Sequence, residues 1–252
     1  MTEESLNIGI VCYPTPGGSG VVATELGVSL AQRGSKVHFI TSGHPARLNH
    51  FDENLYLHKV ETGEYPLFQQ YTPYSLSLAV KIREVAHQYG LDLVHVHYAI
   101  PHATSAYLAK QMMGDHKLRT LTTLHGTDIT LVGMMPSFYE ITRFSISVSD
   151  GITAVSNFLR DETIREFKIE SPIDVIHNFV DSEEFKPIED CGIRKRLAPN
   201  DEKLMIHVSN FRKVKNIPVV LEVYNKVRKR LPTRLVLVGD GPEREATERG
   251  AA

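Results

Sequence analysis

The fold is decided by residues 6–33, which begin Leu6-Asn7-Ile8-Gly9-Ile10-Val11-Cys12 and continue after Tyr13 as Pro14-Thr15-Pro16-Gly17-Gly18-Ser19-Gly20. Apolar residues then recur at Val22, Leu26 and Leu30 before Gly34, the spacing of one face of a helix. We therefore expect a buried strand, a tight loop and a helix. This is the opening of an α/β fold.

The same alternation continues along the chain. Further strands are expected at residues 36–41, 55–60, 91–97, 118–124, 151–155 and 173–176, and further helices at 74–89, 101–113, 138–148 and 156–167. Strands that alternate with helices predict a parallel, Rossmann-like sheet with helices on both faces. The N-terminal Rossmann-like domain is expected to span residues 1–181.

A second Rossmann-like domain is expected to begin at residue 182, after a stretch with mixed charges and no long apolar run. Strands are expected at residues 204–208 and 235–238, with a helix at 218–230 between them, and the polar tail 243–252 is expected to hold no element. Two strands and one helix cannot cover both faces of a sheet. The sequence therefore predicts that this domain, residues 182–252, is incomplete.

Composition excludes several classes of protein. The 252 residues include 28 Lys and Arg, 30 Asp and Glu, and 42% hydrophobic residues, for a formal charge of -2. This balance argues against global disorder and against nucleic-acid or membrane binding by bulk charge. No apolar run approaches the ~20 residues that span a bilayer, and residues 1–5 do not resemble a signal peptide. Cys12 and Cys191 form no CxxC motif, which argues against a disulfide framework or a zinc knuckle. A cytoplasmic protein is expected.

The glycine loop predicts an anion site, because glycines allow close backbone approach and a helix N-terminus offers free N–H groups. Gly18, Gly20 and Ala23 also match the dinucleotide fingerprint. The acidic residue expected after the second strand is missing, although Arg47 is available for a 2′-phosphate. A nicotinamide-dependent oxidoreductase therefore remains an alternative.

Several histidines are expected where strands end. His95 and His97 share one face of a strand, and His102 and His125 follow nearby. A zinc site is one interpretation, but no cysteine or paired carboxylate completes a ligand set, so we expect no metal. His125 directly follows a strand and precedes Gly126, a position typical of ligand binding.

A basic loop is expected at the corresponding edge of the second domain. It reads Ser209-Asn210-Phe211-Arg212-Lys213-Val214-Lys215-Asn216, and Gly239-Asp240-Gly241-Pro242 follows the next strand. A solvated charged loop is the simpler interpretation. Its position after a strand and before a helix favours phosphate binding.

Taken together, these motifs resemble retaining glycosyltransferases of the GT-B fold. The resemblance rests on the glycine loop, His95-Val96-His97-Tyr98, Leu124-His125-Gly126-Thr127-Asp128, the basic loop and Gly239-Asp240-Gly241-Pro242-Glu243. It points in particular to a branch that transfers N-acetylglucosamine from UDP-N-acetylglucosamine to the hydroxyl of L-malate. That reaction is the first step of bacillithiol biosynthesis and is expected to need no metal or other cofactor.

The resemblance also implies roles for individual residues. His125 would act at the reacting centre, and Gly18 would approach the donor phosphates. Malate would be held by Ser19, Tyr98, Thr122, Thr123 and Arg143, and the donor diphosphate by Asn210, Arg212 and Lys215. Asn210 departs from the wider superfamily, which carries an arginine there. Arg143 suits a carboxylate, and its helix is expected to face a core through Phe138, Ile141, Phe144 and Val148.

Two further alternatives stay open. A related glycosyltransferase would use another acceptor, such as an inositol phosphate or a lipid. A catalytically silent binding module is the other, because the family's Glu-x7-Glu motif has no counterpart in the sequence. A homodimer is also left open.

Overall fold

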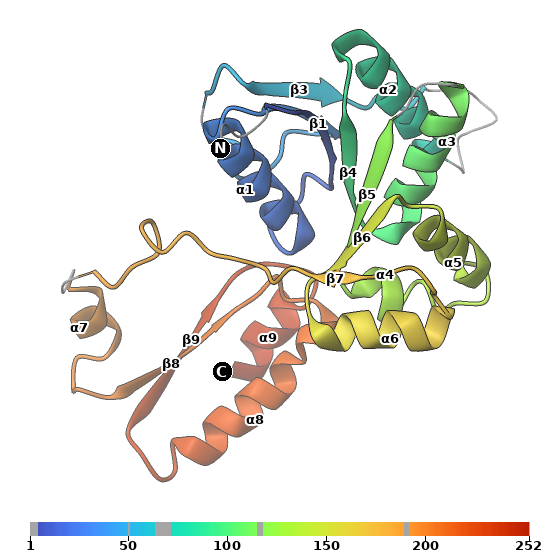
Figure 1. Cartoon of the computed structure of the whole chain (residues 1–252). Helices are drawn as coiled ribbons and strands as arrows, with labels where there is room; N and C mark the ends of the chain where they lie inside the picture. Colours follow the sequence, from blue (N-terminus) through green and yellow to red (C-terminus); the bar gives the residue numbers. More distant parts are fainter. Residues whose placement is uncertain (1–4, 50, 64–71, 115–117, 189–191, 252) are drawn as a thin grey trace. The chain divides into compact units, whose positions relative to one another are not determined.

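A computed structural model describes residues 5–49, 51–63, 72–114, 118–188 and 192–251 (Figure 1). The chain forms two compact units, Met1–Phe179 (unit 1) and Val180–Ala252 (unit 2). The sequence placed the boundary between residues 181 and 182. Each unit is described by itself.

Unit 1 is built on a seven-stranded sheet in the order β3-β2-β1-β4-β5-β6-β7, and every neighbouring pair is parallel. The strands are β1 (Asn7–Val11), β2 (Lys36–Thr41), β3 (Leu55–Lys59), β4 (Leu93–His97), β5 (Arg119–Leu124), β6 (Gly151–Ala154) and β7 (Asp174–Val175). The expected parallel sheet is therefore confirmed. Within unit 1 all the strand C-termini lie at one edge of this sheet, called here the carboxyl edge.

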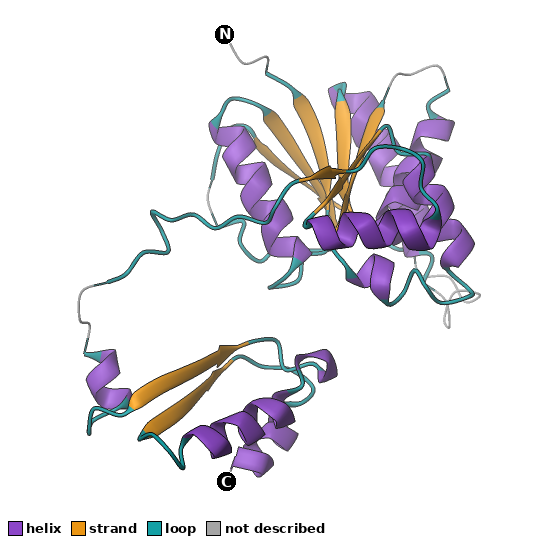
Figure 2. Ribbon diagram, turned by 60° about the horizontal axis from the view of Figure 1, so that its bottom comes forward, coloured by secondary structure: helices purple, strands orange, loops and turns teal. Residues whose placement is uncertain are grey.

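Helices cover both faces of the sheet in unit 1 (Figures 1 and 2). They are α1 (Ser19–Gln32), α2 (Tyr74–Tyr89), the π-helical turn η2 (Ala99–Ala103), α3 (Thr104–Met112), α4 (Thr127–Thr130), α5 (Tyr139–Ser147) and α6 (Asn157–Phe167). Local signals set several ends: α2 stops at Gly90, which adopts the left-handed conformation, and the Ser156 hydroxyl accepts the N–H of Leu159 at 3.1 Å at the start of α6.

The core of unit 1 follows the alternation of side chains along each strand. Ile10 and Phe39 pack with Ala23 of α1, while Ile40 and Val96 face away from them and pack with α2 and α3. Strands β2, β4 and β6 are buried along almost their whole length. Such continuous burial is typical of parallel strands covered on both faces.

Unit 2 contains a two-stranded parallel sheet, β8 (Lys203–Val208) and β9 (Thr233–Val238). Its helices are α7 (Ile193–Leu197), the 3-10 turn η3 (Lys213–Lys215), α8 (Ile217–Val227) and α9 (Arg244–Ala251). Helices α8 and α9 contact each other and lie on the same side of the two strands (Figure 2). Within the described part of unit 2 no helix covers the other side, and Val208 there is 71% exposed.

Two expectations about helices were wrong. The polar tail forms α9, in which Arg244 pairs with Glu248 at 2.9 Å and Glu245 pairs with Arg249 one turn apart. Helix α5 does not face the core through Ile141 and Phe144, which are 38% and 39% exposed.

The buried side of α5 is instead formed by Thr142, Ser145 and Ile146. The Ser145 hydroxyl lies 2.7 Å from that of Thr104, so the internal contact of this helix is partly polar. Hydrogen bonding between hydroxyls lets small polar residues replace apolar ones in such a contact.

Candidate functional site

Aromatic and imidazole rings gather where β1, β4 and β5 end in unit 1. Tyr13 follows β1, Tyr98 follows β4, His102 lies in η2 and His125 follows β5. Ring centroids lie 5.8 Å apart for Tyr13 and Tyr98, 4.5 Å for Tyr13 and His102, and 5.3 Å for Tyr98 and His125. The carboxyl edge of a parallel sheet is where α/β proteins bind ligands, so this ring cluster is the candidate site.

Tyr98 adopts an unusual backbone conformation at this site. Its φ is +92°, a value that side chains other than glycine rarely adopt, and its N–H donates to the Thr123 carbonyl at 2.9 Å. Such strain persists only where the surroundings impose it, and it concentrates at functional sites. The hydrogen bond to β5 helps to hold Tyr98 in this conformation, in which its ring lies 5.3 Å from that of His125.

Asp128 joins the loops that follow β4 and β5. One carboxylate oxygen accepts the Ala99 N–H at 3.0 Å, and the other accepts those of His125 and Gly126 at 3.2 and 3.0 Å. Asp128 is 3% exposed, and burial raises the pKa of its carboxyl despite these donors. The residue thus fixes the positions of Tyr98 and His125 without facing solvent.

His97 and His125 form a direct pair. The Nδ1 atom of His97 lies 2.8 Å from Nε2 of His125, and the two rings stack at 5.1 Å. His97 is buried, whereas His125 is half-buried. Burial lowers the pKa of His125 to about 4 and holds that of His97 well below its usual range. Both imidazoles are therefore neutral near pH 7.

The start of α1 lies at the same edge of the sheet. Gly18 occupies the N-cap position with φ +54° and is exposed, whereas Ser19 is 6% exposed. A Cβ on Gly20 would lie 2.5 Å from the Tyr13 carbonyl oxygen, so only glycine fits there. The loop therefore packs tightly against Tyr13 and leaves the N–H groups of a helix N-terminus near an exposed glycine.

Thr122 and Thr123 lie on opposite faces of β5. Thr123 is in register with His97, and its hydroxyl lies 2.7 Å from both His95 Nε2 and the Thr153 hydroxyl. Thr122 is in register with Val96, and its hydroxyl lies 2.7 Å from that of Ser149. Both threonines are buried. Only Thr123 shares a face with the paired histidines, and both hydroxyls already have partners within the protein.

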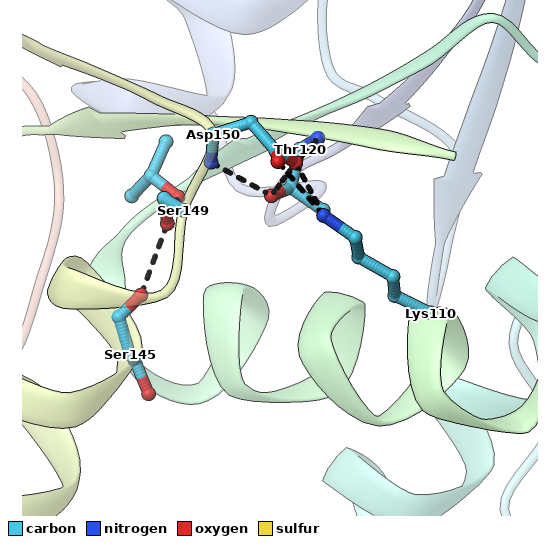
Figure 3. A network of polar contacts seen from close by, with 6 residues as sticks. Lys110, Thr120, Ser145, Ser149 and Asp150 are labelled. Atoms are coloured by element: carbon cyan, nitrogen blue, oxygen red, sulfur yellow. Dashed lines mark hydrogen bonds and ion pairs between the residues drawn. The ribbon is translucent and has the colours of Figure 1, made fainter. Parts of the chain in front are cut away.

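The neighbourhood of Ser149 is a structural network (Figure 3). Its hydroxyl donates to the Ser145 carbonyl at 3.0 Å. Beside it, Asp150 accepts hydrogen bonds from Lys110 at 2.7 Å and from the Thr120 amide at 2.7 Å. These contacts join α3, α5, β5 and the start of β6, so the Thr122 hydroxyl is part of a network of protein groups.

Arg143 is exposed on α5, and no described residue forms an ion pair with it. Helix α5 packs against η2, the turn that directly follows Tyr98. An exposed guanidinium with no ion-pair partner among the described residues is suited to a carboxylate, which it binds in a bidentate manner.

A second candidate site lies in unit 2, where β8 and β9 end. A Cβ on Gly239 would lie 1.8 Å from the Ser209 carbonyl oxygen, and the Glu243 N–H donates to the Phe211 carbonyl at 2.9 Å. The two loops are thus locked together through their backbones. Asn210, Arg212 and Lys215 are exposed there, just before α8 begins at Ile217, and no described residue forms an ion pair with either cation.

Two features of the first site were not predicted from the sequence. One is the role of Asp128, although an acidic residue at the third position after His125 is a signal for a buried carboxylate that accepts loop N–H groups. The other is the contact of His97 with His125, which only the register of β4 and β5 brings together. Among the described residues, no group of three or more His, Cys, Asp and Glu side chains is arranged to hold a metal ion.

The chain belongs to Glycosyltransferase Family 4, which matches residues 16–184. A second family, Glycosyl transferases group 1, matches residues 192–252. The two matches correspond to most of unit 1 and most of unit 2. None of the helices in the described part of the chain has the length and apolar content needed to cross a bilayer.

Individual relatives agree with this assignment. An N-acetyl-alpha-D-glucosaminyl L-malate synthase from Bacillus anthracis is 49% identical over 94% of this chain and 62% of its own length. The GPI3 subunit of a phosphatidylinositol N-acetylglucosaminyltransferase from Saccharomyces cerevisiae (strain RM11-1a) is 26% identical over 94% of this chain and 53% of its own. The chain thus spans less than two thirds of the length of either relative.

Solved structures confirm the fold. A glycosyltransferase from Rickettsia africae ESF-5 matches 98% of this chain and 64% of its own, with a TM-score of 0.73 and 22% identity. Anabaena HepE in complex with UDP-glucose matches 97% of this chain and 64% of its own, with a TM-score of 0.71 and 15% identity. The expected α/β fold of GT-B glycosyltransferases is confirmed, and the oxidoreductase interpretation loses its support.

Proposed function

We propose that this protein transfers N-acetylglucosamine from UDP-N-acetylglucosamine to the hydroxyl of L-malate, with retention at the anomeric carbon, as the first step of bacillithiol biosynthesis. The observation that carries the proposal is the 49% identity to the L-malate synthase over 94% of the chain. The GPI3 relatives, whose name specifies a phosphatidylinositol acceptor, are only 26% identical over a similar share.

In this proposal unit 1 binds the acceptor. Arg143 binds a malate carboxylate, and Tyr98 and Ser19 line the acceptor position beside it. Arg143 is exposed, has no ion-pair partner among the described residues and lies on a helix packed against η2, and these features support this role. The Thr123 hydroxyl is already engaged with His95, so in this proposal Thr123 acts on the acceptor site through that contact.

Unit 2 binds the donor diphosphate. Arg212 and Lys215 supply positive charge where β8 ends, and the N-terminus of α8 adds its free N–H groups. Asn210 offers an amide in place of a further cation. Unit 1 has its own position for close approach of a phosphate in this proposal, at Gly18.

The reaction needs no protein nucleophile. The malate oxygen forms a bond to the anomeric carbon on the face from which UDP departs, and the bonding electrons of the broken C–O bond remain on the UDP phosphate. The proton of the malate hydroxyl passes to that phosphate. His125, which is neutral near pH 7, contacts the sugar close to this centre. Preorganised hydrogen bonds of this kind stabilise developing charge.

The proposal is tested by titrating the protein with L-malate in a calorimeter. We expect a Kd of about 0.1–1 mM without donor and at least a tenfold weaker Kd for Arg143→Ala, about 1.4 kcal/mol. Arg83→Ala is the control, because it removes an exposed arginine from a different helix, α2, and it should leave the Kd unchanged. Incubation with UDP-N-acetylglucosamine and malate should release UDP and form the glycosylated acid.

Two results would overturn the acceptor assignment. One is malate binding that is unaffected by Arg143→Ala. The other is tighter binding of inositol phosphate than of malate, which would favour the acceptor class named for the GPI3 relatives.

A further inference from the structure

The buried partner of His125 has one ring nitrogen that bonds to nothing. His97 uses Nδ1 for the contact with His125, whereas its Nε2 is buried and has no hydrogen-bond partner among the described residues. The His97 ring packs against that of His95, with centroids 4.6 Å apart, and against that of His125, with centroids 5.1 Å apart. His97 is 1% exposed, so solvent does not satisfy this atom.

Two neutral imidazoles in direct contact have only two arrangements of protons. Each neutral ring carries one N–H, and one of the two rings must donate. If His97 donates through Nδ1, its Nε2 is a bare acceptor, and the proton of His125 is on Nδ1. If His125 donates through Nε2, the His97 proton is on Nε2, and a donor is buried without a partner.

The first arrangement is favoured. A buried N–H without an acceptor is rarer in proteins than an acceptor that lacks a donor. The unpaired Nε2 of His97 therefore indicates a lone pair at that position. In this arrangement His125 carries its proton on Nδ1, the ring nitrogen that makes no hydrogen bond with any described residue.

We propose that His97 is a positioning residue that holds His125 in its Nδ1–H tautomer, so that His125 presents a hydrogen-bond donor to an oxygen atom of the ligand at the carboxyl edge of unit 1. The identity of that oxygen as one of the sugar or the acceptor rests on the proposed function. The tautomer itself follows only from the pair and its burial.

The tautomer is measured directly by NMR of the protein labelled with 15N-histidine. Two-bond proton–nitrogen correlations show which ring nitrogen carries the proton, and a His125→Gln spectrum assigns the signals. We expect Nδ1–H for His125 in the unmodified protein. His97→Phe, which keeps a stacking ring but removes the donor, should convert His125 to the Nε2–H form that free imidazole side chains prefer.

Two further variants control the result. His97→Asn keeps an N–H close to the position of Nδ1 and should preserve the Nδ1–H form. His38→Phe alters another buried histidine that pairs with a second histidine, at 2.9 Å, and should leave the His125 signals unchanged. In turnover, we expect His97→Phe to lower kcat/KM by about tenfold and His97→Asn by less than about threefold.

An Nε2–H form of His125 in the unmodified protein overturns the proposal, whether or not the variants fold. So does an Nδ1–H form that survives in His97→Phe. The NMR measurement uses no substrate, so its failure leaves the glycosyltransferase proposal intact. A failure of malate binding, in turn, leaves the tautomer result intact.

Discussion

Unit 1 contains two histidine pairs that are alike in chemistry and different in position. His38 Nδ1 lies 2.9 Å from His58 Nε2, and His97 Nδ1 lies 2.8 Å from His125 Nε2. One ring of each pair is 1% exposed and the other is half-buried. Burial lowers the pKa of every member.

The surroundings of the pairs differ. His38 lies within β2 and packs against Tyr56 at 4.6 Å and Tyr89 at 4.6 Å, so its neighbours are rings of the strand and helix beside it. His125 lies beyond the end of β5, beside the strained Tyr98 and the buried Asp128. Burial, pairing and a lowered pKa are therefore common to both pairs. Position at the carboxyl edge of the sheet is what makes the pair of His97 and His125 part of the candidate site.

Acid should destabilise the protein through both pairs alike. The unfolded histidine pKa is about 6.5, and that of folded His38 is about 4, so the unfolded state binds more protons between these values. The free energy of unfolding should fall as pH decreases through this window, by roughly 3 kcal/mol for His38 alone. Urea unfolding at a series of pH values measures it.

The variants His38→Phe and His97→Phe should each make the dependence of stability on pH shallower, by up to about 1.4 kcal/mol per pH unit. Above about pH 7.5 neither should change the slope, because these histidines are then neutral in both the folded and the unfolded state. A wild-type slope in both variants would falsify the link between burial and acid sensitivity.

Transferase activity should depend on the pair of His97 and His125 and not on the pair of His38 and His58. We expect His125→Ala to lower kcat/KM by about 100-fold, or about 2.7 kcal/mol of transition-state stabilisation, because in the proposed reaction it removes a contact near the reacting centre. His58→Ala should change kcat/KM by less than about threefold. UDP release with UDP-N-acetylglucosamine and malate is the measurement, and equal losses in the two variants would remove the distinction.

The same rule of position applies to lysines in unit 2. Lys215 follows the end of β8 and precedes α8, whereas Lys203 begins β8. Lys215→Ala should lower kcat/KM for the UDP sugar by about tenfold, about 1.4 kcal/mol. Lys203→Ala, another exposed lysine, should have no measurable effect, and a loss of similar size would show that charge matters more than position.

The smallest effect is expected for a substitution in β5. Thr122→Val removes a buried hydroxyl bonded to Ser149 and should lower the free energy of unfolding by about 1 kcal/mol. Malate affinity should stay unchanged, because Thr122 faces away from the paired histidines. Calorimetric titration together with thermal unfolding decides this, and weaker malate binding at unchanged stability would return Thr122 to the site.

Much of unit 1 could be predicted from the sequence because its signals are local. A strand, a glycine and a helical period specify β1, the loop and α1, and Ser156 alone identifies the start of α6. Helix α9 escaped prediction because it has little apolar content and depends on ion pairs one turn apart. The orientation of α5 escaped because Ser145 and Thr142 face inward, against the apolar pattern.

The candidate site likewise has parts that could be predicted from the sequence and parts that could not. Tyr98 and His125 could be predicted as site residues, because each directly follows a strand of a parallel sheet. To predict that Thr122 and Thr123 face different sides of the sheet, one must know which face of β5 lies toward the paired histidines. To predict the contact of His97 with His125, one must know the register between β4 and β5. Neither is contained in a single stretch of sequence, because both depend on which strands become neighbours.

The shared carboxylate of Asp128 has a consequence for how this site changes over evolutionary time. The loops after β4 and β5 both end on this one buried group, so an insertion or deletion in either loop withdraws donors from it and leaves its oxygens unsatisfied. The lengths of the two loops are thereby constrained together. New acceptor preferences are expected to arise through single substitutions on exposed surfaces such as that of α5, where Arg143 can be replaced without disturbing a buried charge.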